Sequence, residues 1–100
     1  MTDTKPIPKA ELQAACRRLC QRLAAALLRT MADADATFGL IDKRLGKKPG
    51  ASQAMLYRLA EGRAVRLREI SDFTWAMGCE LDFHCISRRE ELKITGQGDD

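Results

Sequence analysis

The feature that most constrains the fold of this chain is a short segment with one apolar face, residues 51–62 (ASQAMLYRLAEG). Its two leucines, Leu56 and Leu59, are three residues apart and therefore share one face of a helix. Ser52 is a suitable N-cap, and Gly62 stands where a helix commonly ends in the left-handed conformation. Because an isolated helix of this length is marginal in water, this one must pack against its neighbours.

The longest neighbour is an expected helix at residues 9–32, which follows Pro8 and has one apolar stripe. The stripe consists of Leu12, Cys16, Leu19, Cys20, Leu23, Leu27 and Met31. About 24 residues make a rod ~36 Å long, whereas a domain of this size has a radius of gyration of only ~13 Å. The first turns therefore either overhang the core and contact a second subunit, or bend, fray or pack within their own subunit.

Two shorter helices are expected to complete the core. One runs from about Phe38 to Leu45, after a cap at Asp35 or Thr37, and a glycine ends it. The other covers residues 67–77 and is also followed by a glycine. Its members expected to supply most of the core are Leu67, Ile70, Phe73, Trp75, Ala76 and Met77.

Residues 79–86 (CELDFHCI) change period, because every second residue is apolar, as in a half-buried strand. A lone strand cannot satisfy its backbone, so this segment either pairs with its copy in a second subunit or packs on the helices as an extended tail. The sequence thus predicts an all-α bundle of four to five helices, with a long first helix and a short C-terminal strand or extended tail. The expected domain covers residues 9–86, between a flexible leader at 1–8 and a charged, largely disordered tail at 87–100.

Positive charge is concentrated around the glycine-bounded helix, although the net charge of the whole chain is only +3. Residues 42–68 hold two acids and eight bases, namely Lys43, Arg44, Lys47, Lys48, Arg58, Arg63, Arg66 and Arg68. From residue 80 onward, six acids outnumber three bases. Such a basic segment is the footprint expected for a polyanionic partner. The alternative is a solvated basic face that has no partner.

The chain has four cysteines, and two of them fall inside the expected long helix. Since no secretory signal or membrane span is visible, we expect reduced thiols in a cytoplasmic protein. The cysteine spacings beside His84 match no zinc finger, ribbon or knuckle, so neither a metal nor another cofactor is expected. With one histidine, no carboxylate pair in an apolar context and no phosphate-binding glycine loop, we predict no catalytic residues and no enzyme.

Three segments together resemble a known family. They are FGLIDKRLG (residues 38–46), SQAMLYRLAEGR (52–63) and LREISDFTWAMGCELDF (67–83), which have the outline of a helix-turn-helix module at 37–78. The chain here resembles the repressor and Cro-like helix-turn-helix regulators of phages and bacteria, also called the xenobiotic-response-element family. The last segment is similar to family members, antitoxins among them, that have a short strand after the final helix.

The resemblance implies sequence-specific binding of double-stranded DNA by a homodimer that regulates transcription, often as a repressor. Base reading would come from the start of the second segment, at Ser52, Gln53, Ala54, Tyr57 and Arg58. Phosphate contacts would come from Lys47, Lys48, Arg63, Arg66 and Arg68. The turn at 47–51 is longer than is usual in the family, and its Pro-Gly either swings the following helix or adds two lysines to the phosphate contacts.

Two surfaces are candidates for the two-fold dimer contact, where one patch meets its own copy. The first, which the length of the helix favours slightly, is the stripe at Leu12, Cys16 and Leu19, and the second is the strand face at Leu81 and Phe83. The alternative function is an antitoxin-like or antiactivator module that uses the same scaffold to hold a protein partner, and both roles can coexist. No membrane partner is expected.

Overall fold

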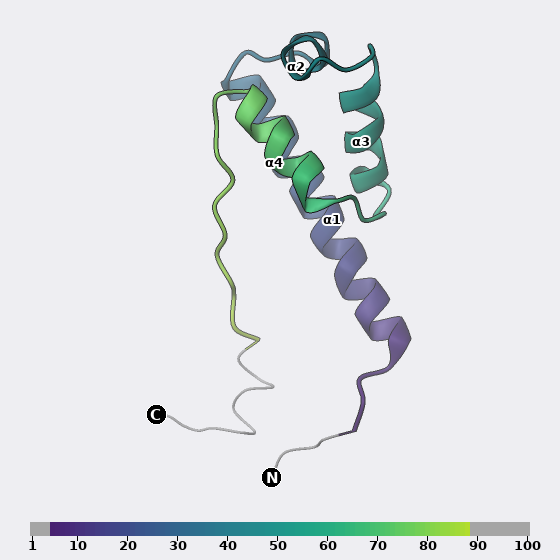
Figure 1. Cartoon of the computed structure of the whole chain (residues 1–100). Coiled ribbons are helices and arrows are strands. Elements are labelled where there is room, and N and C mark those ends of the chain that lie inside the picture. The colour runs from purple at the N-terminus through teal and green to yellow at the C-terminus, as the bar shows by residue number, and fades with distance from the viewer. Residues whose placement is uncertain (1–4, 89–100) are drawn as a thin grey trace.

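The computed structural model describes residues 5–88, and within them the chain forms four helices and no strand (Figure 1). The helices are α1 (Lys9–Asp33), α2 (Phe38–Leu45), α3 (Ala51–Ala60) and α4 (Leu67–Ala76). The fold of the described chain is therefore all-α. None of these helices is long and apolar enough to cross a bilayer.

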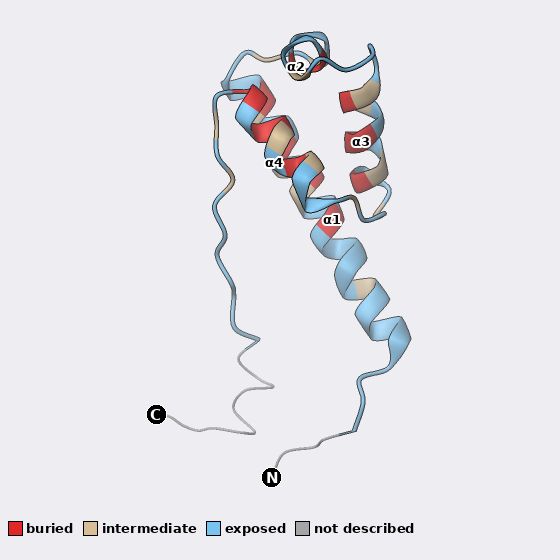
Figure 2. Ribbon diagram, in the orientation of Figure 1, coloured by how far each residue is buried: buried red, intermediate tan, exposed pale blue. Residues whose placement is uncertain are grey.

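Helix α1 is a rod of 25 residues that begins directly after Pro8. Its buried residues, Cys20, Ala24, Leu27 and Met31, all lie from the middle of the helix onward. The first half extends beyond the other helices and is almost entirely exposed (Figures 1 and 2). Because the core is too small to cover the whole rod, the first three turns keep contact with solvent.

The core is formed by all four helices, with residues 20–31 as the contribution of α1. Helix α3 packs on α1, and α2 packs on both α3 and α4. The largest fully buried side chains come from all four helices and are Phe73, Leu27, Ile41, Leu56 and Leu59. The apolar periodicity of each segment is therefore used on one face, as expected for amphipathic helices around a single core.

The prediction that Leu67 and Trp75 of α4 belong to the core is wrong. Leu67 and Trp75 are 65% and 68% exposed, whereas Ile70 and Phe73 are 6% and 1% exposed. Residues 67, 71 and 75 are spaced by four and form a stripe on the outer side of α4, away from the buried residues. An apolar run that occupies both faces of a helix cannot reveal by itself which face meets the core.

Residues 79–88 leave α4 as an extended segment, which we call the tail segment (Figure 1). The expected short strand is absent from the described residues, and the alternative of an extended tail describes them instead. A strand needs a second strand to accept its backbone hydrogen bonds, and this chain supplies none between residues 5 and 88. The expected leader at 1–8 and the expected disordered tail at 87–100 fall largely outside the described residues.

Candidate nucleic-acid interface

The start of α3 is held by a side chain from α2. Asp42 Oδ2 accepts a hydrogen bond from the Gly50 N–H at 2.8 Å, and Asp42 Oδ1 accepts one from the Ser52 N–H at 2.8 Å. The Ser52 hydroxyl also donates to Asp42 Oδ1. Both side chains are buried, with Asp42 3% and Ser52 4% exposed. A buried carboxylate thus serves as the cap that free N–H groups at a helix start require.

This arrangement corrects both expectations for Ser52. The N-cap of α3 is Gly50, whose φ of 94° is a left-handed conformation that suits glycine, and Ser52 lies inside the first turn. Because the Ser52 hydroxyl is buried and donates to Asp42, it cannot reach a base edge. At α2 the structure selects one of the two expected caps, since Thr37 Oγ1 accepts from the Leu40 N–H at 3.1 Å.

The capping bonds also change the acidity of Asp42. The hydrogen bond from the Ser52 hydroxyl lowers the pKa of Asp42; burial opposes that shift, and the N–H groups of Ser52 and Gly50 and the charge of Lys47 lower it further. The net direction is a pKa below the usual value for an aspartate. The ionised carboxylate is therefore the form that holds α2 and α3 together.

Acidification should weaken the contact between Asp42 of α2 and the start of α3. Because the folded pKa of Asp42 lies below its unfolded value of ~3.9, its stabilising contribution is complete above that value and is lost as the pH falls through the folded pKa. We expect the thermal midpoint of the parent protein to fall more steeply than that of Asp42→Asn between about pH 5 and about pH 2. Asp33→Asn, which alters an exposed carboxylate on α1, is the control. Equal pH profiles for the parent and Asp42→Asn would contradict the role of Asp42.

The outward face of α3 carries three of the predicted base-reading residues. Ala54 is exposed, Tyr57 is 57% exposed and Gln53 is partly buried. Gln53 Nε2 donates to the Tyr57 hydroxyl at 2.9 Å, so the two polar groups lie together one turn apart on the same face. The amide and the phenol can exchange this bond for one to a base edge, and the Ala54 methyl suits contact with a thymine methyl.

Arg58, the last of the predicted base-reading residues, has a different position. Its Nη2 donates to Glu69 Oε1 at 2.8 Å, and the two side chains are 37% and 26% exposed. Glu69 Oε2 in turn accepts from the Arg66 N–H at 3.2 Å, at the start of α4. Arg58 therefore ties the end of α3 to the start of α4, and its guanidinium is occupied rather than free to read a base.

The five predicted phosphate-binding residues are all exposed: Lys47, Lys48, Arg63, Arg66 and Arg68. Arg63 forms an exposed ion pair with Glu61 at 2.7 Å. No ion pair within residues 5–88 involves either lysine of the loop between α2 and α3, so their charge is available to a partner. Since Asp42 is buried in its cap, the outer surface of this loop is basic.

The predicted dimer residues lie in two separate places. Leu12 is 53% exposed, Leu19 is 60% exposed and Cys16 is exposed, all on the overhanging half of α1. On the tail segment, Leu81 is partly buried and Phe83 is 71% exposed. Both surfaces therefore offer apolar area to a partner.

The described part of the chain holds no cluster of three metal-ligating side chains. The four thiols are unpaired, with Cys16 and Cys85 exposed, Cys79 partly buried and Cys20 buried. Burial, together with the neighbouring Cys16 thiol, raises the pKa of Cys20. Cys20 is thus a residue of the core rather than a reactive group.

Sequence reasoning missed Asp42 and Glu69, which position α3 without touching a partner. Asp42 lies four residues after Phe38 and three before Leu45, within the apolar stripe of α2. An acid in that position is a recognisable signal, because a carboxylate on a buried face requires hydrogen-bond donors nearby.

Comparison with known proteins leaves the geometry as the guide to function. No family model matches this chain, and no curated protein or solved structure is significantly similar to it.

Proposed function

We propose that this protein is a sequence-specific double-stranded DNA-binding regulator of transcription, acting in the cytoplasm as a homodimer on a near-palindromic site. In this proposal α2, the loop at 46–50 and α3 form a helix-turn-helix module, and α3 enters the major groove. The observation that carries it is the joint between α2 and α3. The buried carboxylate of Asp42 caps α3 and fixes it against α2. An exposed pair of lysines precedes the outward side chains of α3.

The distribution of charge supports this orientation. The two lysines lie in the loop before α3, and Arg66 and Arg68 lie at the start of α4, where they are exposed. Bases on both sides of α3 can contact phosphates on the two edges of a groove and orient the protein without reading sequence. Of the two acids in residues 42–68, Asp42 is buried in the cap of α3 and Glu61 pairs with Arg63, and no ion pair within residues 5–88 involves Lys48, Arg66 or Arg68.

The longer turn fits the same proposal. Gly46 ends α2 with a φ of 67°, and the loop returns through Pro49 to Gly50, whose N–H is bound to Asp42. The added residues thus leave the start of α3 attached to α2, and they place Lys47 and Lys48 on the outer surface. Of the two effects expected for the lengthened turn, we infer the addition of phosphate contacts.

Selection of bound duplexes from a random pool is the experiment that tests the function. We expect enrichment of a near-palindrome whose half-sites are about one helical turn, ~34 Å, apart. Affinity for the enriched duplex should fall linearly with the logarithm of salt concentration, as phosphate contacts require. Recovery of the unselected pool with no enriched sequence would contradict specific recognition.

Gln53→Ala tests whether α3 is the reading element. We expect relaxed preference at one base pair in each half-site, at a cost of ~1–3 kcal/mol for the preferred base, with little effect on binding to random duplex. Gln13→Ala, which removes the same amide from the overhanging half of α1, is the matched control. An unchanged preference for the selected site in Gln53→Ala would exclude this residue as a reader.

A second function has an observation of its own in its favour. The exposed apolar residues of α1 and of the tail segment offer surface to a protein partner, which suits an antitoxin-like or antiactivator module. In that case a different protein would cover these residues, and the DNA-binding surface would be secondary. A light-scattering mass equal to one chain at micromolar concentration, with no enrichment of duplexes, would favour this second function. Neither function requires catalysis, and we infer no enzymatic activity.

A further inference from the structure

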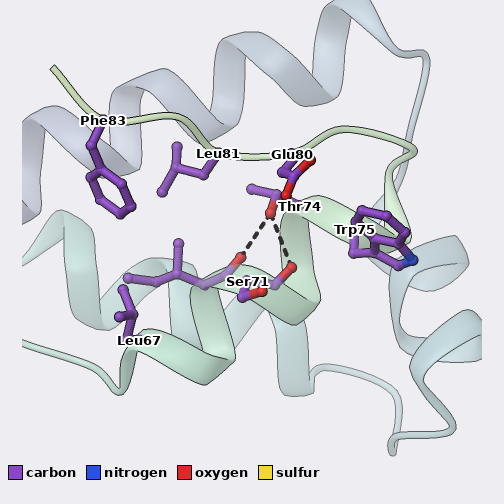
Figure 3. Close-up of a pocket in the computed structure, with 8 residues that line it drawn as sticks. Leu67, Ser71, Thr74, Trp75, Glu80, Leu81 and Phe83 are labelled. Carbon is purple, nitrogen blue, oxygen red and sulfur yellow. Dashed lines mark hydrogen bonds between the residues drawn. The ribbon is translucent and has the colours of Figure 1, made fainter.

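The tail segment separates two hollows on the surface of the protein. The first, between the tail segment and α4, includes Leu67, Trp75, Leu81 and Phe83 in its lining (Figure 3). The second, between the tail segment and α1, includes Leu19, His84 and Ile86. Residues 80, 81 and 83 of the tail segment line the first hollow, and residues 84, 86 and 88 line the second. From residue 81 onward, the residues that line the first hollow are odd-numbered and those that line the second are even-numbered. This alternation is typical of a β-strand, here without a partner strand among residues 5–88.

The backbone of the tail segment has almost no hydrogen bonds. Within the described residues, the N–H and C=O groups of residues 80–87 make a single bond, from the Phe83 N–H to the adjacent Asp82 side chain at 2.9 Å. An extended segment with free donors and acceptors on both edges is a template for strand pairing. Among the large apolar side chains of the described residues, the four with the highest exposed fraction lie on or beside the tail segment: Phe83 is 71%, Ile86 76%, Trp75 68% and Leu67 65% exposed.

The sequence of the tail segment is complementary to itself when two copies run antiparallel. With Phe83 opposite its own copy, Leu81 faces Cys85 and Asp82 faces His84, each pair occurring twice about the two-fold axis. On one face of the ribbon Leu81, Phe83 and Cys85 then meet apolar residues, and on the other face Asp82 meets His84 and Glu80 meets Ile86. A parallel arrangement would instead place the acids of one copy beside the acids of the other.

We propose that residues 80–86 pair antiparallel with the same residues of a second copy, and that this two-stranded ribbon, with Phe83 on its axis, is the dimer interface. The ribbon satisfies backbone groups on the inner edge of each segment and covers Phe83 and part of the hollow beside Leu67 and Trp75. In this proposal, residues 5–88 of one chain contain no strand because the strand forms only when its partner is present.

This interface replaces the stripe on α1 as the expected dimer contact. The backbone of α1 is satisfied within its own helix, so only side chains there remain to be covered. Leu12 and Leu19 are two turns apart, and scattered exposed leucines are normal on a protein surface. The tail segment offers apolar side chains and unpaired backbone groups together.

The inference rests on the proposed homodimer, and its test uses no DNA, so the two can fail separately. The mass of the full chain is measured by light scattering over a micromolar concentration range, with helix content followed by circular dichroism. We expect the parent to be a dimer and Phe83→Asp to be a folded monomer, with the dissociation constant raised at least ~100-fold. Fold is retained because Phe83 makes few contacts within its own chain. Leu12→Glu with Leu19→Glu is the matched control and should remain a dimer.

A charge exchange tests the register itself. Asp82→Lys and His84→Glu, each made alone, break the two Asp82–His84 pairs, and His84→Glu also places acids opposite each other; each should raise the dissociation constant by about 2- to 30-fold. The double variant places a lysine opposite a glutamate across the axis and should recover the affinity of the parent. Under mild oxidation, Leu81→Cys should form a disulfide with the partner's Cys85, and adding Cys85→Ser should abolish it.

Three results would overturn the interface. A dimeric Phe83→Asp beside a monomeric α1 variant would place the contact on α1 and leave the proposed dimeric function standing. A dimer sensitive to Phe83 but with no recovery in the charge-exchange variant, and no Cys85 cross-link, would exclude this strand register. A parent protein that stays monomeric throughout would overturn both the interface and the homodimer, and duplex selection would then decide separately whether a monomer binds DNA.

Discussion

Lys47→Glu together with Lys48→Glu is expected to lower affinity for the selected duplex at least ~100-fold at ~0.1 M salt. Both lysines are exposed at the start of α3, and neither forms an ion pair within residues 5–88. Reversing both charges removes two phosphate contacts per subunit and adds repulsion from the same phosphates. If each contact releases about one counterion, the slope of log affinity against log salt should decrease by roughly 4 for the dimer.

A control variant separates the loss of direct phosphate contacts from the effect of a changed net charge. Lys9→Glu with Arg29→Glu makes the same change in net charge at exposed positions on α1, outside the basic segment. This control should lose much less affinity, because exposed charges beyond about one Debye length, ~10 Å at 0.1 M salt, are largely screened. Fluorescence anisotropy with labelled duplex at several salt concentrations measures both quantities. Equal losses in the two variants would mean that the loop makes no direct phosphate contact.

Phe73→Ala is expected to destabilise the fold by ~3–5 kcal/mol, enough to leave a domain of this size largely unfolded or close to it. Phe73 is 1% exposed and lies in the centre of the core with Leu27, Ile41 and Leu56. Truncation removes a buried ring and leaves a cavity lined by side chains from several helices. Urea unfolding followed by circular dichroism gives the free energy of unfolding.

Trp75→Ala is the control for that experiment. Trp75 is only two residues away on the same helix and is larger, but it is 68% exposed, so its loss should cost well under ~1 kcal/mol in the single chain. Because Trp75 borders the proposed dimer ribbon, unfolding is measured at two protein concentrations, which identifies any contribution from association. A loss as large as that of Phe73→Ala, independent of concentration, would mean that Trp75 belongs to the core.

The positions of the helices could be predicted from local signals. The expected helix at 9–32 is Lys9–Asp33, the expected span from Phe38 to Leu45 is α2 itself, and α3 and α4 begin where their periodic patterns begin. These bounds depend on glycines, caps and apolar spacing, which act over a few residues along the chain. The all-α class follows from them.

The faces that meet the core could not be predicted in the same way for every helix. In α4, both Phe73 and Trp75 belong to one apolar run, and only packing in the four-helix core, where α4 meets α2, selects Phe73 for burial. The roles of polar residues depended on packing as well. Ser52 and Arg58 stand in the expected reading segment, yet Asp42 and Glu69, which are ten and eleven residues away in sequence, bind them.

The sequence by itself determined where the chain turns and which stretches are helical, since those choices are decided between residues a few positions apart. The tertiary structure decided which side chains are left for a partner. Gln53, Ala54, Tyr57 and the loop lysines remain at the surface, while Asp42 holds the start of α3 and Glu69 holds its end through Arg58. The tail segment shows the same division. Its alternating pattern is local, but a strand requires hydrogen-bond partners, and residues 5–88 supply none. The alternating sequence therefore appears here as an extended segment whose backbone makes almost no hydrogen bonds within the described residues.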